Sequence, residues 1–403
     1  MTAAANAAAE VELLRRHAPR LRFDSCECLR PTTVDAYVGA SAVLDGHDRV
    51  TDAADGGLAK LAQPGTRLWR LRPLPPESPD CGEERSNALL ERFAGARAAD
   101  RPAVCYGRVQ PARGSIFLQY WFFYVDNPCV LDPGRHDGDW ELVQLRLTPA
   151  RRLTHVTVAQ HGGPETRSVA PGITRPEIFV AVGSHASYLR AGTQPKLPLA
   201  DECDALRPPA EELRVEPFPA DRQWWTWRGR WGMDRGPGSW LATRLHLPRT
   251  PWFLRWLNGI GAGDSPASPR WQHASWGAPA RWQATGAAHR VTRVALRELL
   301  HRLGRMTWPR NPPAVEVNRV EPRAVSIRAQ PAGRGPRRIF RVSFVFQDAA
   351  GGRPLGTHTV RADGRSHSVA LGHGGELGWR AAGYNRLRQR GNTGERQVLA
   401  GPG

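Results

Sequence analysis

Four segments between residues 116 and 188 carry the strongest structural signal in this sequence. They read IFLQYWFFYV (116–125), DWELVQLRL (139–147), THVTVAQH (154–161) and EIFVAVGSHASY (177–188), and Gly or Pro residues follow each of them. Short runs rich in aromatic and β-branched residues are typical of strands. The first run is apolar at nearly every position, as expected of a strand buried on both faces. We therefore predict a mainly β fold, with a β-sandwich core, flanking helices and long loops.

The length of 403 residues is enough for two or three domains. We assign residues 1–285 to a β-sandwich domain, in which 8–20 and 32–44 are expected to be helices. Residues 286–312 should form a helix and a proline linker. Short strand-like runs in 313–403 predict a second, small β-sandwich domain, with Phe340, Phe344 and Phe346 in its core.

Tryptophan is common, with 15 copies, and many of them fall in residues 221–285. This tryptophan-rich segment has neither strand nor helix periodicity, so we expect it to wrap around the first sandwich. Four of its side chains should be largely buried as structural cover: Trp224, Trp225, Trp227 and Trp231.

The net charge of +18 is concentrated at the C-terminal end, where residues 281–403 hold 22 arginines and seven acids. An anionic partner is therefore possible for the C-terminal domain. The N-terminus lacks the pattern of a secretory signal, and no apolar stretch is long enough to span a membrane. We expect a cytoplasmic monomer whose six cysteines are reduced thiols.

The segment GRHDGDWELVQL (134–145) places charge at the start of a strand. Alternate residues of a strand share a face, so Asp139 and Glu141 point the same way, toward the core at its open end. Carboxylates there are costly unless they are paired or bind a metal. His136 on the preceding turn and Asp126 on the neighbouring strand could complete a site for Mg²⁺, Ca²⁺ or Mn²⁺. The alternative is that these acids pair with arginines or cap turns.

Further polar residues are candidates for contacts with a ligand near the ion. His161 and His185 both end predicted strands, and His185 stands between Ser184 and the pair Ser187 and Tyr188. Asp137 adds a further carboxylate beside His136. A histidine at a strand end is more often a hydrogen-bonded structural residue, and that alternative stays open.

Four motifs, in this order, resemble the vacuolar protein sorting-associated protein 62 family: HAPRLRFDSCECLRPTTVDAYV, LQYWFFYVDN, HDGDWELVQLRL and VAVGSHASY. The same core is similar to necrosis-inducing cytolysins, whose GHRHDWE heptad binds a divalent cation on a β-sandwich. Matched on Asp-Trp-Glu, the ligand positions of that heptad fall on His136, Asp139 and Glu141, with Asp126 as a looser match. The C-terminal domain is similar to fibronectin type III domains.

These observations leave three functions open. The first is a binding module, in which a divalent cation bridges the protein to a lipid or glycan headgroup. The second is a metal-dependent hydrolase, with water on the cation as nucleophile and His136 or His185 as base. The third is nucleic-acid binding by the basic C-terminal domain. The first two need the same ligands, so the sequence does not separate an enzyme from a binding protein.

Overall fold

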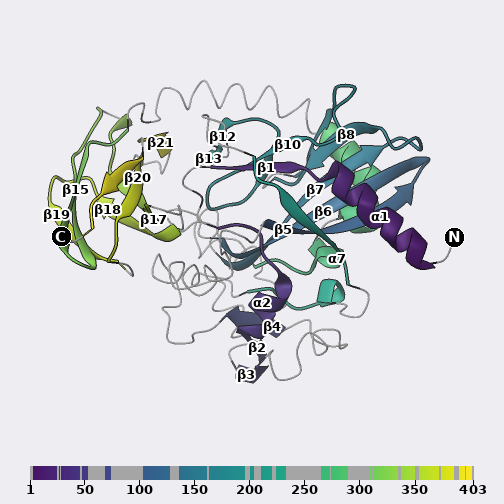
Figure 1. Cartoon of the computed structure of the whole chain (residues 1–403), viewed down its shortest axis with the longest axis horizontal. Helices are drawn as coiled ribbons and strands as arrows, with labels where there is room; N and C mark the ends of the chain where they lie inside the picture. The colour runs from purple at the N-terminus through teal and green to yellow at the C-terminus, as the bar shows by residue number, and fades with distance from the viewer. Residues whose placement is uncertain are drawn as a thin grey trace, which may run out of the picture. The chain divides into compact units, whose positions relative to one another are not determined.

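The computed structural model describes a large part of the chain in two compact units (Figure 1). The described residues are 3–24, 27, 29–45, 48–52, 69–73, 103–127, 136–160, 163–195, 200–203, 210–219, 224–232, 265–272, 274–288, 309, 312–334, 337–349, 354–371, 374–384, 390–394 and 396–401. The first unit holds those up to residue 192 and from 203 to 288, and the second holds those of 193–202 and from 309 onward. Most of 286–312 lies outside the described residues, so the domain boundaries stay a prediction.

The first unit is built from short helices and many strands. In chain order its elements are α1 (Ala3–His17), β1 (Arg20–Phe23), α2 (Val34–Gly39), β2 (Ser41–Asp45), β3 (Asp48–Asp52), β4 (Trp69–Pro73), β5 (Ala103–Ala112), β6 (Ser115–Asn127), β7 (His136–Leu147), β8 (Leu153–Val158), β9 (Glu165–Ser168), β10 (Glu177–Val180), β11 (Ser187–Tyr188), β14 (Leu213–Pro217), the 3₁₀ turn η3 (Trp224–Thr226), α7 (Pro269–Gln272) and the 3₁₀ turn η5 (Ala274–Trp276). Residues 279–288 are also helical. Two further strands, β12 (Gly192–Pro195) and β13 (Ala200–Cys203), pair with each other.

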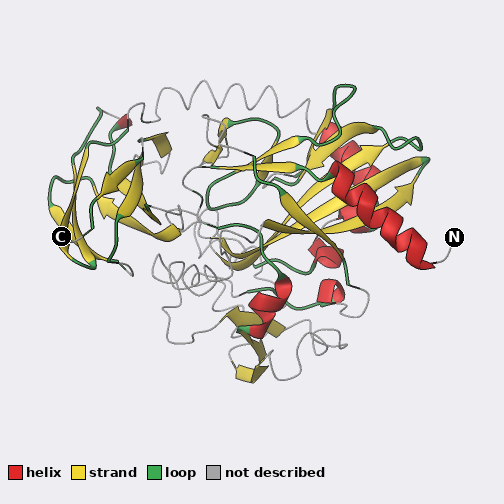
Figure 2. Ribbon diagram, in the orientation of Figure 1, coloured by secondary structure: helices red, strands yellow, loops and turns green. Residues whose placement is uncertain are grey.

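A six-stranded sheet in the order β14-β5-β6-β7-β8-β9 forms the centre of the first unit. Two three-stranded sheets accompany it, β1-β10-β11 and β3-β2-β4. Strands dominate and helices are short, which confirms the mainly β prediction (Figure 2). Both faces of β6 are buried, since residues 117–127 are all shielded from solvent. The continuous apolar run of this strand predicted that burial.

Different elements cover the two faces of the six-stranded sheet. On one face lies α1 (Figure 1). The Tyr120 hydroxyl donates a hydrogen bond to the carbonyl of Leu14 in this helix. On the other face lies the tryptophan-rich segment, which buried amide side chains of the sheet hold in place. Gln119 donates to the Ser275 carbonyl at 2.8 Å and Gln144 donates to the Pro279 carbonyl at 3.1 Å.

Three of the four tryptophans predicted as cover are buried. Trp224, Trp227 and Trp231 are at most 1% exposed, whereas Trp225 is partly exposed. Trp224 and Trp231 pack on Trp140 of β7, with ring centroids 5.4 Å away in both pairs. The prediction of structural cover is therefore confirmed for these three side chains.

The tryptophan-rich segment crosses β7 at two glycines. A Cβ on Gly138 would lie 2.4 Å from the carbonyl oxygen of Trp231, and a Cβ on Gly232 would lie 1.8 Å from that of Asp137. Gly138 also has a φ of +63°, in the left-handed region that disfavours other residues. The two backbones can approach this closely because neither residue has a side chain.

One predicted helix is shorter than expected. The first helix covers Ala3–His17 and not residues 8–20, since Pro19 follows its end and Arg20 begins β1, and the second covers Val34–Gly39 and not residues 32–44. Ser41–Asp45 form a strand, β2, which pairs with β3 and β4 on its two sides. The apolar run SAVL suits a helix or a buried strand by pattern alone, and pairing with β3 and β4 determines the outcome.

The second unit contains two further sheets, with the strand orders β15-β16-β19 and β18-β17-β20-β21, and β22 pairs with β20. Their strands are β15 (Val315–Glu321), β16 (Ala324–Ala329), β17 (Arg341–Asp348), β18 (Pro354–Arg361), β19 (Ser366–Ala370), β20 (Leu377–Tyr384), β21 (Arg390–Thr393) and β22 (Gln397–Leu399). Phe344 and Phe346 are fully buried in one apolar cluster, as predicted. Phe340 is 38% exposed, so its prediction as a core residue is wrong.

Among the helices that the structure describes, none has the length and apolar character needed to cross a bilayer.

Replacing Gly138 with alanine should test how tightly the tryptophan-rich segment is held. Gly138→Ala combines left-handed backbone strain with overlap on Trp231, and we expect it to lower the free energy of unfolding by roughly 2–4 kcal/mol. Gly114 is the matched control, because its φ is +66° and no atom lies within 4 Å of an added Cβ. Gly114→Ala should cost about 1–2 kcal/mol from strain alone. Equal losses in urea denaturation would contradict the close crossing.

A partly buried histidine makes the second unit sensitive to acid. Burial lowers the pKa of His358 to about 4, from an ordinary value of 6.5, and its ring lies 5.8 Å from that of Phe346. The folded state therefore binds fewer protons than the unfolded state between these pH values. Stability should be fully present above about pH 6.5 and fall toward pH 4, by at most about 1.4 kcal/mol per pH unit. Thermal melts of His358→Gln should show a smaller loss over this range than the wild type, and identical pH profiles would contradict the assignment.

Candidate functional site

The charged start of β7 lies beside the aromatic end of β6. In the antiparallel register Asp139 stands opposite Tyr124, and Glu141 stands opposite Phe122. The two carboxylates therefore share one face of the sheet, as the alternation in the sequence predicts. Asp139 is 5% exposed and Glu141 is partly exposed. A carboxylate as buried as Asp139 requires a compensating charge or hydrogen-bond donor.

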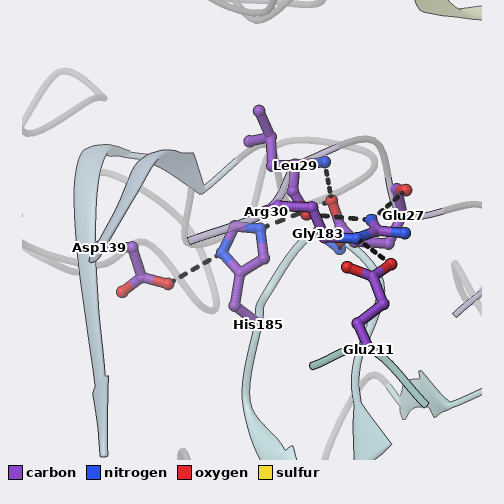
Figure 3. Close-up of polar contacts among 7 residues, drawn as sticks. All are labelled: Glu27, Leu29, Arg30, Asp139, Gly183, His185 and Glu211. Carbon is purple, nitrogen blue, oxygen red and sulfur yellow. Dashed lines mark hydrogen bonds and ion pairs between the residues drawn. The ribbon is translucent and has the colours of Figure 1, made fainter. Parts of the chain in front are cut away.

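His185 supplies that compensation. Its Nδ1 lies 3.0 Å from Oδ2 of Asp139, and its Nε2 lies 3.6 Å from Oε1 of Glu27 (Figure 3). The imidazole is fully buried and stacks on the ring of Tyr124, with centroids 3.9 Å apart and an interplanar angle of 1°. One histidine thus stands between two buried carboxylates that come from distant parts of the chain.

The backbone around His185 is strained to place it there. His185 belongs to the tight turn between β10 and β11 and has a φ of +52°, in the left-handed region that side chains other than glycine rarely adopt. Such a conformation costs about 1–3 kcal/mol and persists where surrounding contacts enforce it. The contacts to Asp139, Glu27 and Tyr124 are those that enforce it here.

Backbone hydrogen bonds hold the carboxylate of Glu27 in position. Its Oε1 accepts a hydrogen bond from the amide of Leu29 and its Oε2 accepts one from the amide of Gly183, both at 2.6 Å. Next to it, Arg30 donates to the Glu27 carbonyl at 3.0 Å and to Oε1 of Glu211 at 2.6 Å (Figure 3). These bonds tie the segment after β1 to the β10–β11 turn.

The protonation state of His185 is determined by the charges around it. Burial by itself lowers the pKa of His185, but the negative charges of Glu27 and Asp139 outweigh burial and raise that pKa to about 9. Burial likewise raises the pKa of Glu27, yet the charge of His185 and the two amide hydrogen bonds bring it below its ordinary value. At neutral pH the arrangement is therefore an imidazolium between two carboxylates.

A pocket of about 330 Å³ opens beside this cluster. Its polar lining combines carboxylates, amides, an imidazole, a hydroxyl and a guanidinium: Asp139, Glu141, Asn127, Gln160, Gln272, His136, Ser265 and Arg230. Its apolar walls come from Trp140, Trp271, Ala159, Pro266 and Ala267. The pocket is formed where the tryptophan-rich segment meets the first residues of β7 and the end of β8.

The structure brings three of the four predicted metal ligands to this pocket, but in different roles. His136 lies in β7 opposite Asn127, not on a turn. Its Nδ1 donates to the Gly138 carbonyl at 2.7 Å, and its Nε2 accepts from the Asn127 amide at 3.2 Å. Both ring nitrogens are thus engaged within the protein, and Asp139 is engaged by His185.

The remaining predicted residues lie elsewhere. Asp126 stands opposite Asp137 across β6 and β7, and both are almost fully buried. Ser184 and Tyr188 are buried near the β10–β11 turn. None of these four lines the pocket. His161 lies outside the described residues.

Among the described residues, no three His, Cys, Asp or Glu side chains come together in a way that could hold a metal ion. The ligand set of His136, Asp139, Glu141 and Asp126 stays a prediction. The divalent cation stays a prediction, as does the hydrolase that would use it.

Sequence reasoning missed several residues of this site. Glu27 falls in DSCECL (24–29), and a single acid there belongs to no motif that would mark it as part of a site. Arg230, Trp271 and Gln272 belong to the tryptophan-rich segment, which has no periodicity to show which side chains face a ligand. His185 was identified, but its contact with Glu27 joins positions 158 residues apart and has no signature in sequence.

Comparisons with known proteins give limited likenesses. No protein-family model matches the chain, and no curated protein matches it. A solved structure described as NLPPya in complex with mannosamine is 15% identical over 51% of this chain and 73% of its own, with a TM-score of 0.28. One described as a toxin fold for microbial attack and plant defense has 15% identity, covering 51% and 72%, with a TM-score of 0.27. The FN5 domain of Drosophila Lar is 13% identical over 24% of this chain and 98% of its own, with a TM-score of 0.18. The likeness to the vacuolar protein sorting-associated protein 62 family stays a prediction.

Removing the charge of Glu27 should destabilise the first unit strongly. Glu27→Gln leaves His185 with one carboxylate in a fully buried place, and breaking a buried ion pair typically costs about 3–5 kcal/mol. The matched control is Glu212→Gln, because Glu212 pairs with Arg175 but its side chain is 65% exposed. That change should cost less than about 1 kcal/mol. Chemical denaturation of the two variants checks the difference, and similar losses would contradict the central role of the buried cluster.

Proposed function

We propose that the protein is a binding module and that the pocket beside β7 takes up a polyhydroxylated headgroup of a glycan or glycolipid. The observation that supports this most is the pocket's lining, in which two carboxylates, three amides and a guanidinium surround one small cavity. Its volume of about 330 Å³ also lies at the lower end of the range typical of small-molecule sites.

The chemistry of the lining favours hydroxyl groups over other ligands. A hydroxyl both donates and accepts, so it can donate to Asp139 and Glu141 and accept from Arg230 or from an amide. A small anion would be repelled by the two carboxylates. An apolar ligand would displace the water bound to the polar groups and would form no hydrogen bonds in its place. Trp271, which is 41% exposed, supplies apolar surface for the carbon skeleton of a sugar ring or an inositol.

The rigid cluster behind the pocket suits recognition. His185 fixes one oxygen of Asp139 by a hydrogen bond of 3.0 Å, so this carboxylate is oriented before a ligand arrives. Pre-oriented polar groups lose less conformational entropy on binding, and this increases affinity without adding contacts.

Ligand-observed NMR with glucose, mannose and myo-inositol as probes tests the proposal. We expect at least one of them to bind the wild-type chain and Glu141→Gln to weaken that binding about tenfold, because a hydrogen bond to a charged group is lost. Glu10→Gln is the matched control, since Glu10 is exposed on α1 and the change in charge is the same. No binding to any probe, or equal binding by Glu141→Gln and wild type, would contradict the pocket assignment.

The same assay separates ligand binding from the predicted cation. Because both nitrogens of His136 are engaged by Asn127 and Gly138, we expect sugar binding to survive EDTA. Loss of binding in EDTA, with recovery on adding Mg²⁺, Ca²⁺ or Mn²⁺, would instead support the cation that the sequence predicts. Turnover of an oligosaccharide probe during the measurement would favour the hydrolase.

A further inference from the structure

Three arginines lie over two tryptophans, Trp276 and Trp271, and Trp271 also lines the pocket. The Cζ atoms of Arg228 and Arg270 lie 5.1 Å and 5.2 Å from the ring centroid of Trp271. The Cζ of Arg108 lies 4.1 Å from that of Trp276, and its guanidinium donates to the Trp276 carbonyl at 2.8 Å. We call these five residues the arginine–tryptophan rim.

The charges of the rim are not neutralised within the described part of the chain. No ion pair there involves Arg108, Arg228 or Arg270, although arginines elsewhere in the first unit pair with Glu177, Glu211 and Glu212. Burial lowers the pKa of Arg108, and the positive charge of Arg270 lowers it further, so these two guanidiniums repel each other. An external anion would stabilise such a cluster of like charges, which has no ion pair with an acid among the described residues.

The tryptophans hold the guanidiniums in place. A guanidinium over an aromatic ring within about 6 Å is attracted by the ring electrons, and this restricts the position of its charge. Arg228 and Arg270 are exposed, and Trp271 is 41% exposed, so the outer part of the rim is accessible. Rigid guanidinium groups match planar carboxylates and tetrahedral sulfates by paired hydrogen bonds.

Trp271 connects the rim to the pocket, because it lines the pocket and its ring also contacts the guanidinium groups of Arg228 and Arg270. We propose that the rim binds oxyanion groups of the same glycan whose hydroxyls enter the pocket, so that the ligand is an acidic glycan. This inference rests on the proposed function and specifies the chemical class of the ligand. The carboxylates inside the pocket exclude the anionic group, and the rim outside attracts it.

Single-stranded nucleic acid is a weaker match to the rim. Its binding sites use several exposed aromatic rings on which successive bases stack. Here Trp271 already carries two guanidiniums, and Trp276 is half-buried against Trp121 and Phe218, with centroids at 6.1 Å and 5.2 Å. The rim therefore offers charge more than stacking surface.

Binding of the full chain to three oligosaccharides of equal length tests the proposal: a heparin hexasaccharide, hexagalacturonate and neutral maltohexaose. We expect the acidic probes to bind at least about tenfold more tightly than the neutral one at low salt, and this advantage to shrink as salt increases. Comparison of heparin with hexagalacturonate distinguishes sulfate from carboxylate as the preferred group. A single-stranded oligodeoxynucleotide of similar charge serves as the fourth probe.

The key variant is Arg228→Gln/Arg270→Gln, which should remove the preference for acidic probes and leave maltohexaose binding unchanged. The matched control is Arg151→Gln/Arg152→Gln, which removes the same charge from exposed arginines in the turn after β7, at the end of the strand remote from the site. An equal loss in the control would show a general charge effect and overturn the proposal. Tighter binding of the oligodeoxynucleotide than of either acidic glycan would overturn it in favour of nucleic acid.

The outcomes also separate this inference from the proposed function. If maltohexaose binds through Glu141 but the acidic probes bind no better, the acidic-glycan inference fails and the pocket assignment stands. If none of the glycans binds, both fail.

Discussion

The imidazole of His185 between Glu27 and Asp139 is the interaction on which the architecture of the first unit depends. It joins the segment after β1, the β10–β11 turn and the start of β7, which are distant in sequence. Burying each of these charges alone would be strongly unfavourable, but the opposite charges stabilise one another. Two backbone amides also donate hydrogen bonds to the carboxylate of Glu27. The strained backbone of His185 shows that surrounding packing enforces this geometry.

The pocket follows from a second constraint, the crossing of the tryptophan-rich segment over β7. Gly138 and Gly232 allow the two backbones to touch, and this brings Arg230 and Trp271 to the carboxylates of β7. The result is a pocket whose lining includes two carboxylates and Arg230, with the positive charges of Arg228 and Arg270 beside its wall residue Trp271. That separation of charge is what favours a ligand with hydroxyls at one end and an acidic group at the other.

Part of this site was predictable. Alternation in β7 placed Asp139 and Glu141 on one face, and the structure agrees. The partner of Asp139 was not predictable in the same way. A carboxylate near the core requires a positive charge, and a divalent cation and a protonated histidine meet that requirement equally well at the level of sequence. His136 looked the closer histidine by numbering, yet its strand register directs it to Asn127 and Gly138.

The sequence by itself determined the mainly β class, the double burial of β6, the shared face of the two carboxylates and the role of three tryptophans as cover. These properties follow from local periodicity and composition, which each segment carries within itself. The tertiary structure alone decided that SAVLD pairs as a strand, that His185 neutralises Asp139, and that Arg228 and Arg270 meet on Trp271. Each of these depends on contacts between separate segments, such as β2 with β4, Asp139 with His185 and Arg228 with Trp271, and the periodicity of one segment does not show its partner.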